Sequence, residues 1–149
     1  MAIARGAGTE IIRSVHLEEL GDSVEEVIFG VQHHIYTVLS IIVHAGGLNA
    51  DTDWIHCYLE GYDTAAGATA QCFDIFKQDM SVAQTYVWND KFSFMGFEPV
   101  DFTAGLDSVA KQDAIADQGS SVAQKLWIHG EHASDNFDVT CTYIDQNNA

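Results

Sequence analysis

The pattern of apolar and polar residues along this 149-residue chain is dominated by one stretch, His34–Ala45. Within it, Ile35–Val43 is almost continuously apolar and rich in β-branched residues, and two glycines follow the stretch at once. The run is too short to cross a membrane as a helix, which takes about 20 apolar residues. A short apolar run of this kind is typical of a β-strand that is buried on both faces. We predict that the domain packs around this strand.

Alternation of apolar and polar residues predicts further strands before and after this stretch. The clearest pair lies near the C-terminus, where Val122–Glu131 and Phe137–Ile144 flank the predicted turn His132–Asn136. We expect this pair to form a β-hairpin. A helix is the alternative for Thr9–Leu20, because its last residues are good helix formers. The other predicted strands are Thr9–Leu20, Val24–Val31, Trp54–Tyr62, Ala70–Lys77, Val82–Trp88 and Lys91–Phe97.

One segment, Thr103–Gly119, interrupts the β pattern. It offers apolar residues at helical spacing, with Asp107 as a candidate cap and Gly119 as a stop signal, which predicts one short helix or helical loop. About eight short strands without a βαβ rhythm predict an all-β domain. We therefore predict an antiparallel β-sandwich, with the jelly roll as a candidate topology.

The domain organisation follows from the composition. Residues 1–8 are rich in Ala and Gly, and we expect a flexible arm that precedes a single domain over residues 9–149. The chain has one proline and no low-complexity tract, so we expect no linker. The N-terminus is too short and too weakly apolar for a secretory signal, which predicts synthesis in a cytoplasm.

The charge narrows the classes of partner. The net charge is −16, from 22 acidic and 6 basic residues. Nucleic acid and anionic membranes are excluded as direct partners, because both are bound by clustered Lys and Arg. Two interpretations of the acidity stay open. It keeps a crowded or multivalent protein soluble, or it serves acidic loops that bind divalent cations or a basic partner.

The candidate metal site is the stretch HGEH, which contains His129, Glu131 and His132. On a β scaffold, zinc or iron is bound by histidine and carboxylate ligands. His129 and Glu131 share one face of a strand, whereas His132 faces the other way unless the turn has begun. The candidates for a more distant ligand are His33, His34, His44 and His56. The stretch matches a cupin-type pattern only in part, so we expect surface or interface histidines and predict no metal and no cofactor.

The acidic loop before Trp54 resembles a calcium loop only superficially. It contains Asn49, Asp51 and Asp53, but it lacks the Gly and the Glu that an EF-hand loop has at its sixth and twelfth positions. We expect a solvated turn.

Signatures of catalysis are missing from the sequence. There is no GxSxG motif and no phosphate-binding glycine loop. Adjacent carboxylates on a strand point to opposite faces and make poor acid–base pairs. Cys57, Cys72 and Cys141 lie inside predicted strands, where we expect reduced, buried thiols, with a Cys57–Cys72 disulfide as the alternative. We predict that the chain is not an enzyme.

From residue 35 to the C-terminus the chain resembles the capsid decoration, or cement, proteins of tailed bacteriophages, which have β-sandwich folds. The segments that carry the resemblance are IYTVLSIIVHAGG, DWIHCYLEGYD, CFDIFK, TYVWNDKFSF, AIADQGSS and SDNFDVTCTYIDQNN, in that order. The resemblance implies a symmetric oligomer, often a trimer, that sits on the capsid surface and clamps neighbouring subunits of the major capsid protein. It brings no catalytic residue to this chain.

We accordingly predict a non-enzymatic virion structural protein that decorates and stabilises a phage capsid. Aromatic residues that alternate with core positions are typical of interfaces, although they also fit the second sheet of the sandwich. The candidate interface residues are Ile35, Val38, Ile42, Trp54, Tyr58 and Trp127. One alternative is a receptor- or glycan-binding module, such as a fibre head or lectin-like domain. Another is a cupin-like metalloenzyme that uses His129, Glu131 and a further histidine.

Overall fold

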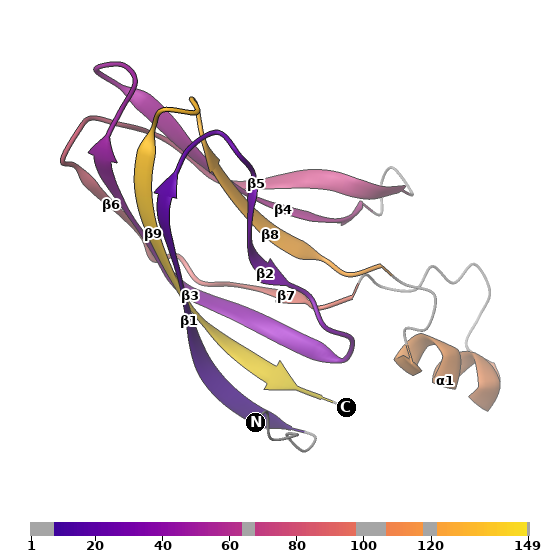
Figure 1. Ribbon diagram of the computed structural model, residues 1–149. Coiled ribbons are helices and arrows are strands. Elements are labelled where there is room, and N and C mark those ends of the chain that lie inside the picture. The colour runs from indigo at the N-terminus through magenta and orange to yellow at the C-terminus, as the bar shows by residue number, and fades with distance from the viewer. Residues whose placement is uncertain (1–7, 64–67, 98–106, 118–121, 149) are drawn as a thin grey trace.

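The computed structural model describes residues 8–63, 68–97, 107–117 and 122–148. The predicted arm, residues 1–8, therefore lies outside the described residues except for Gly8. Figure 1 shows two β-sheets that face one another, with a short helix to one side.

The described strands form two antiparallel sheets with a common core (Figure 1). The five-stranded sheet consists of β1 (Thr9–Leu20), β9 (Asn136–Asn147), β3 (His34–Gly47), β6 (Thr85–Trp88) and β7 (Phe92–Met95). The four-stranded sheet consists of β2 (Glu25–Phe29), β8 (Lys125–Gly130), β4 (Asp53–Asp63) and β5 (Ala68–Met80). The helix α1 (Val109–Asp117) lies inside the segment that was predicted to be helical. The predicted antiparallel β-sandwich is confirmed.

The order of the strands is that of a jelly roll. The five-stranded sheet has the order β1-β9-β3-β6, and β7 pairs with the first part of β3 while β6 pairs with the second. The four-stranded sheet has the order β2-β8-β4-β5. When β6 and β7 are taken as one interrupted strand, consecutive strands change sheet except at β4 and β5, which pair with one another, and the two strand orders are those of a jelly roll built from two Greek keys.

The predicted C-terminal hairpin is wrong. The strands β8 and β9 are consecutive, but β8 pairs with β2 and β4, and β9 pairs with β1 and β3. The short connection between them crosses from one sheet to the other. Both strands alternate because each has one face on the same core, and this pattern is equally compatible with a hairpin.

The prediction that the central strand is buried on both faces is also wrong. In β3 the inner side chains, such as Tyr36, Val38 and Val43, are buried, whereas Ile42 on the outer face is 41% exposed. No second layer covers the outer face among the described residues. The run is apolar on both sides because the outer face also carries isoleucines.

The core lies between the sheets and draws on both. Fully buried side chains come from the inner faces of β3, β4, β5, β8 and β9. The largest of them are Phe137, Ile41, Ile55, Met80, Leu126 and Ile128. Burial of this apolar area supplies about 25 cal/mol per Å², which is the main favourable contribution to folding. The core fixes the two outer faces and the turns at each end of the sandwich.

The turns at one end of the sandwich position the candidate site. The segments 21–24, 48–52, 81–84 and 131–135 all connect strands at this end. The turns 48–52 and 131–135 are neighbours, because Asn49 N–H donates a hydrogen bond to Asp135 Oδ1 at 2.9 Å.

Candidate functional site

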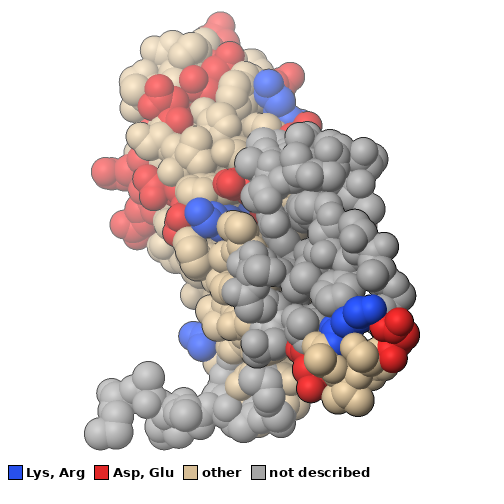
Figure 2. All heavy atoms as spheres, turned by 90° about the vertical axis from the view of Figure 1, so that its right-hand side faces the viewer, with Lys and Arg blue, Asp and Glu red and all other residues tan. Residues whose placement is uncertain are grey.

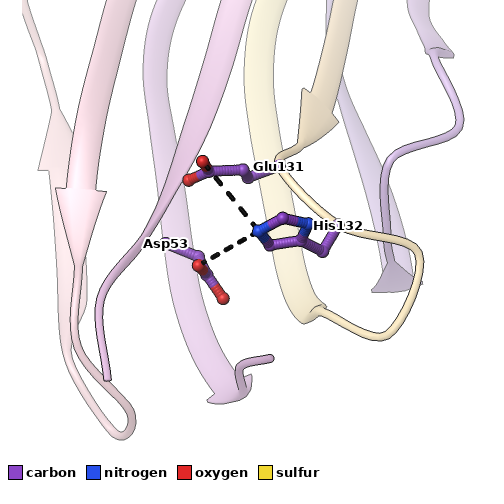
Figure 3. A group of neighbouring side chains, drawn as sticks. All are labelled: Asp53, Glu131 and His132. Carbon is purple, nitrogen blue, oxygen red and sulfur yellow. Dashed lines mark ion pairs between the residues drawn. The ribbon is translucent and has the colours of Figure 1, made fainter. Parts of the chain in front are cut away.

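Three side chains of types that bind metal ions lie together at this end of the sandwich. Asp53 begins β4, and Glu131 and His132 directly follow β8. In Figure 3 both carboxylates point toward the His132 ring. His132 Nε2 is 3.7 Å from Asp53 Oδ1 and 3.9 Å from Glu131 Oε1. These distances are too long for hydrogen bonds, but all three potential ligand atoms lie within 4.8 Å of one another.

Backbone amides hold both carboxylates in place. Ala50 N–H donates to Asp53 Oδ2 at 2.9 Å, and Trp54 N–H donates to Glu131 Oε2 at 3.1 Å. Each carboxylate therefore uses one oxygen to accept a backbone hydrogen bond, and its other oxygen is the one that lies nearest to His132. The backbone, and not His132, therefore orients both carboxylates.

A second buried carboxylate, Asp135, ties the two turns together. Its Oδ1 accepts the Asn49 N–H, and its Oδ2 accepts the His132 N–H at 2.8 Å. Asp135 is 4% exposed and Asp53 is 2% exposed. Their side chains also lie within hydrogen-bonding reach of one another. Two aspartates are thus buried side by side where the turns meet.

The electrostatics of this cluster favour the ionised form of Asp53. Burial by itself would raise the pKa of Asp53. Hydrogen bonds from Ala50 N–H and Asp135, and attraction by His132, outweigh burial and lower the pKa. Among the described residues, His132 is the one basic group that forms an ion pair with these carboxylates. The cluster therefore gathers more negative than positive charge.

The structure brings together two of the three residues predicted as metal-ligand candidates. His129 lies apart from Glu131 and His132, because it points outward from β8. Its ring centroid is 5.3 Å from that of Trp54 and 5.5 Å from that of His56, and its Nδ1 contacts the Gly130 carbonyl at 2.9 Å. Since β8 ends at Gly130, the two-residue period no longer applies, and Glu131 and His132 can face the same point.

Sequence reasoning missed Asp53 and Asp135. The prediction of a solvated turn holds for Asn49 and Asp51, which are exposed, but it is wrong for Asp53. The sequence did indicate that Asp53 is buried. Asp53 lies two positions before the core residue Ile55, so on a β-strand the two side chains point to the same face. Asp135 likewise lies two positions before Phe137, which is fully buried.

The other candidate histidines do not join the cluster. His34 Nδ1 is 2.7 Å from Asp145 Oδ1, and Arg13 pairs with the other oxygen of the same buried carboxylate at 3.0 Å. His33 lies in the turn before β3 with a φ of 64°. His44 contacts the Thr85 hydroxyl at 3.0 Å and His56 contacts Asp74 at 2.7 Å. These contacts link neighbouring segments of the sandwich.

The outer face of the four-stranded sheet is aromatic. We call it the aromatic face, and it comprises Trp54, His56, Tyr58, Trp127 and His129, all half-buried. Register places His56 opposite His129 and Tyr58 opposite Trp127. Neighbouring rings pack at centroid distances of 5.1 to 6.2 Å.

Charged side chains are paired within the aromatic face. Lys77 Nζ lies 3.9 Å from the centroid of the Trp54 ring, in cation–π geometry. Trp127 Nε1–H donates to Glu60 Oε2 at 2.8 Å. The ring face of Trp54 and the indole N–H of Trp127 are therefore both partnered inside the chain.

The outer face of the five-stranded sheet is aliphatic and rich in hydroxyl groups. We call it the aliphatic face, and strand register defines it in three rows across the sheet. The rows are Ile12, Ile144, Thr37 and Ser93; Ser14, Thr142 and Ser40; and His16, Thr140, Ile42 and Val87. No Asp, Glu, Lys or Arg belongs to any of them. Ile12 is 70% exposed and Val87 is 52% exposed.

The predicted interface residues fall into three places. Trp54, Tyr58 and Trp127 lie on the aromatic face, on strands of the second sheet as the alternative has it, and their role as interface residues stays a prediction. Ile42 belongs to the aliphatic face, and Ile35 lies beside it, opposite Met95. Val38 is fully buried in the core and belongs to neither surface.

The cysteines that the structure describes fully are buried free thiols. Cys57 and Cys141 project into the core from opposite sheets. Burial raises the pKa of Cys57, and it raises the pKa of Cys141 to about 12. The side chain of Cys72 lies outside the described residues, although register pairs Cys72 with Glu60, not with Cys57.

Acidic side chains outnumber basic ones on the face shown in Figure 2, as the composition predicts. Among the described residues, none of the helices has the length and hydropathy needed to span a membrane.

Comparison with known proteins gives similarity at the level of fold. No protein-family model and no curated protein matches the chain. Of the solved structures, a subunit of the disulfide-linked pili of Bacillus endospore appendages has 10% identity and a TM-score of 0.43, over 100% of this chain and 97% of that chain. A chain of the empty top-component particles of cowpea mosaic virus has 11% identity and a TM-score of 0.39, over 95% and 87%. A chain of the infectious bursal disease virus Gx strain has 5% identity and a TM-score of 0.38, over 95% and 33%. Because the TM-scores are below 0.5, the proposals below rest on the residues of this chain.

Proposed function

We propose that this chain is a non-enzymatic structural protein of a virus particle that assembles through the aliphatic face of its jelly roll. More specifically, we propose that it decorates and stabilises the capsid of a tailed phage as a homotrimer bound to the major capsid protein. The observation that carries the proposal is an uncharged, partly exposed aliphatic sheet face on a chain of net charge −16.

The argument for self-association rests on charge. Two copies that each carry −16 repel one another, and the repulsion is smallest where the approaching surfaces hold no charge. The three rows of the aliphatic face contain no Asp, Glu, Lys or Arg, and His16, at one edge of the face, is the member that lies beside a charge, with its Nε2 3.3 Å from Glu18 Oε1. They also leave aliphatic side chains exposed, which association would remove from water at about 25 cal/mol per Å². A second copy of the chain is therefore the occupant that we assign to this face.

In this arrangement, we assign the aromatic face to the contact with the capsid. Trp and Tyr are enriched in protein interfaces, and Trp54, Tyr58 and Trp127 lie on one surface. Jelly rolls occur in viral coat proteins, lectins and cupins, so topology alone does not choose among these classes.

Contacts within the aromatic face count against the glycan-binding alternative. Lys77 occupies one side of the Trp54 ring, and Lys125 lies 5.4 Å from the centroid of Trp127. A sugar that stacked on those sides would have to displace both lysines. Binding on a glycan array that is lost in Trp54→Ala would reverse this preference.

The test is solution mass by light scattering on the wild type and two lysine variants. Ile42→Lys places a charge in the aliphatic face, and Val109→Lys places one on α1, at a side chain that is 71% exposed. We expect the wild type and Val109→Lys near three times 16.3 kDa and Ile42→Lys near 16.3 kDa. A monomeric wild type, or an Ile42→Lys variant that keeps the oligomer, would contradict the proposal.

A further inference from the structure

We propose that Asp53, Glu131 and His132 bind one divalent metal ion of the zinc class, which cross-links the start of β4 to the β8–β9 turn. This site is separate from both outer faces of the sandwich. It is independent of the proposed function, because it concerns the cohesion of one chain and not its contacts with others.

The donor set selects the class of ion. Two carboxylate oxygens and one imidazole nitrogen suit zinc and its first-row neighbours. Calcium takes 6 to 8 oxygen ligands and is poorly served by an imidazole. The site therefore differs in kind from the calcium loop that the spacing of Asn49, Asp51 and Asp53 resembles.

Two sides of the site need only a small contraction to hold the ion, and the third side, between the two carboxylates, lies within 4.8 Å. Ligand bonds of about 2.0–2.2 Å in a tetrahedron place ligand atoms about 3.4 Å apart. The distances from His132 Nε2 to Asp53 Oδ1 and Glu131 Oε1 are 3.7 and 3.9 Å. His132 has a side chain that is 44% exposed, so it is the ligand that is free to move inward. Three protein ligands leave a position for water.

The surroundings of the ligands resemble the supporting shell of a metal site. In such sites, hydrogen bonds from outside the ligand set fix the ligand orientation. Here Ala50 N–H and Trp54 N–H each bond the oxygen that does not face His132. Asp135 accepts the His132 N–H and so fixes the backbone of the third ligand.

The burial of the carboxyl groups at the same point also favours a cation. Asp53 and Asp135 are both more than nine-tenths buried and lie within hydrogen-bonding reach. In the described part of the chain, no Lys or Arg forms an ion pair with Asp53, and His132 is the basic group beside it. A buried carboxylate is stabilised by a paired charge or by a metal ion, and a divalent cation would supply that charge.

The experiment measures zinc binding to the chelator-treated full chain by titration calorimetry, with zinc-dependent melting as a second readout. Glu131→Gln and His132→Gln remove ligands, and the glutamine at 131 keeps a carbonyl oxygen for the Trp54 N–H. The matched control is His129→Gln, which removes a neighbouring histidine outside the cluster. Circular dichroism confirms that each variant is folded.

We expect one zinc ion to bind the wild type and His129→Gln, and to raise the melting temperature of both. His132→Gln and Glu131→Gln should weaken binding by more than about tenfold, since the loss of a supporting residue alone costs that much. The proposal is overturned if the wild type binds no zinc. It is equally overturned if His129→Gln abolishes binding while His132→Gln does not, because the ion would then lie at the His56–His129 pair.

Discussion

The two outer faces of the sandwich differ in how far polar and charged side chains of the same chain cover their apolar groups. On the aromatic face, Lys77, Glu60 and Asp74 each contact a ring or its polar edge. On the aliphatic face, the hydroxyl groups are partnered, as in the 2.8 Å contact between Thr37 and Ser93, but the aliphatic side chains between them stay exposed. Burial follows the same division, since Ile12, Ile42 and Val87 on the aliphatic face are exposed, whereas the rings of the aromatic face are half-buried. What separates them is whether the polar partners cover the apolar area.

Neighbouring isoleucines on β3 test this comparison with the largest expected effect. Ile41 is 1% exposed and points into the core, whereas Ile42 is 41% exposed on the aliphatic face. We expect Ile41→Ala to lower the free energy of unfolding by about 2–5 kcal/mol, through lost burial and a cavity. Ile42→Ala should cost less than about 1 kcal/mol at concentrations where the chain is monomeric. Urea unfolding measures both, and equal losses would mean that the outer face is covered within a single chain.

Alkaline pH tests the inner side of the same sheet. Burial, together with the nearby charge of Asp145, raises the pKa of Tyr36 to about 12, and its hydroxyl accepts the Val31 N–H at 3.1 Å. Burial also raises the pKa of Tyr143. Below about pH 10, the pKa of an unfolded tyrosine, Tyr36 is protonated in both states and its contribution to stability is complete. Between pH 10 and 12 the unfolded chain loses this proton first, so the contribution is lost as the pH rises.

The expected loss for Tyr36 is about 2–3 kcal/mol over that window, at 1.36 kcal/mol per unit of pKa difference. Unfolding by urea at successive pH values measures it. The control is Tyr36→Phe, which lacks this titration and loses about 1 kcal/mol at every pH with the hydrogen bond from Val31. The stabilities of wild type and variant should converge above pH 10, and the wild type should become the less stable of the two toward pH 12, because its loss of about 2–3 kcal/mol exceeds the variant's loss of about 1 kcal/mol. Parallel curves for the two proteins would show that Tyr36 does not titrate as its burial requires.

The smallest expected effect comes from removing the cation–π contact between Lys77 and Trp54 on the aromatic face. Lys77→Met keeps the aliphatic part of the side chain but removes the charge over Trp54. We expect a loss of about 0.5–1 kcal/mol, the usual value of an exposed cation–π contact, together with a change in Trp54 fluorescence. Lys91→Met is the control, because Lys91 contacts no aromatic ring among the described residues. Equal effects of the two substitutions would show that the aromatic face is not held by this pair.

Much of the fold could be predicted from the sequence, because the alternation of apolar and polar residues in each strand shows which side chains are buried. The strand Thr9–Leu20 has the predicted bounds, and β4 and β9 alternate as predicted. Period-two alternation states which side chains share a face, but it does not state what lies opposite that face. The β8–β9 connection was misjudged for this reason, since a hairpin and a crossing between sheets give the same alternation.

The candidate site was likewise predictable from the sequence only in part. Glu131 and His132 stood out as potential ligands through their residue types and proximity. Asp53 lies nearly 80 positions earlier, and only the jelly-roll closure brings its turn beside the β8–β9 turn. The covalent chain thus determined the strands, their inner and outer side chains and the acidic charge. The tertiary structure decided which sheets pair, which faces remain uncovered and which carboxylates meet, because these depend on contacts between segments whose separation in sequence carries no information about distance.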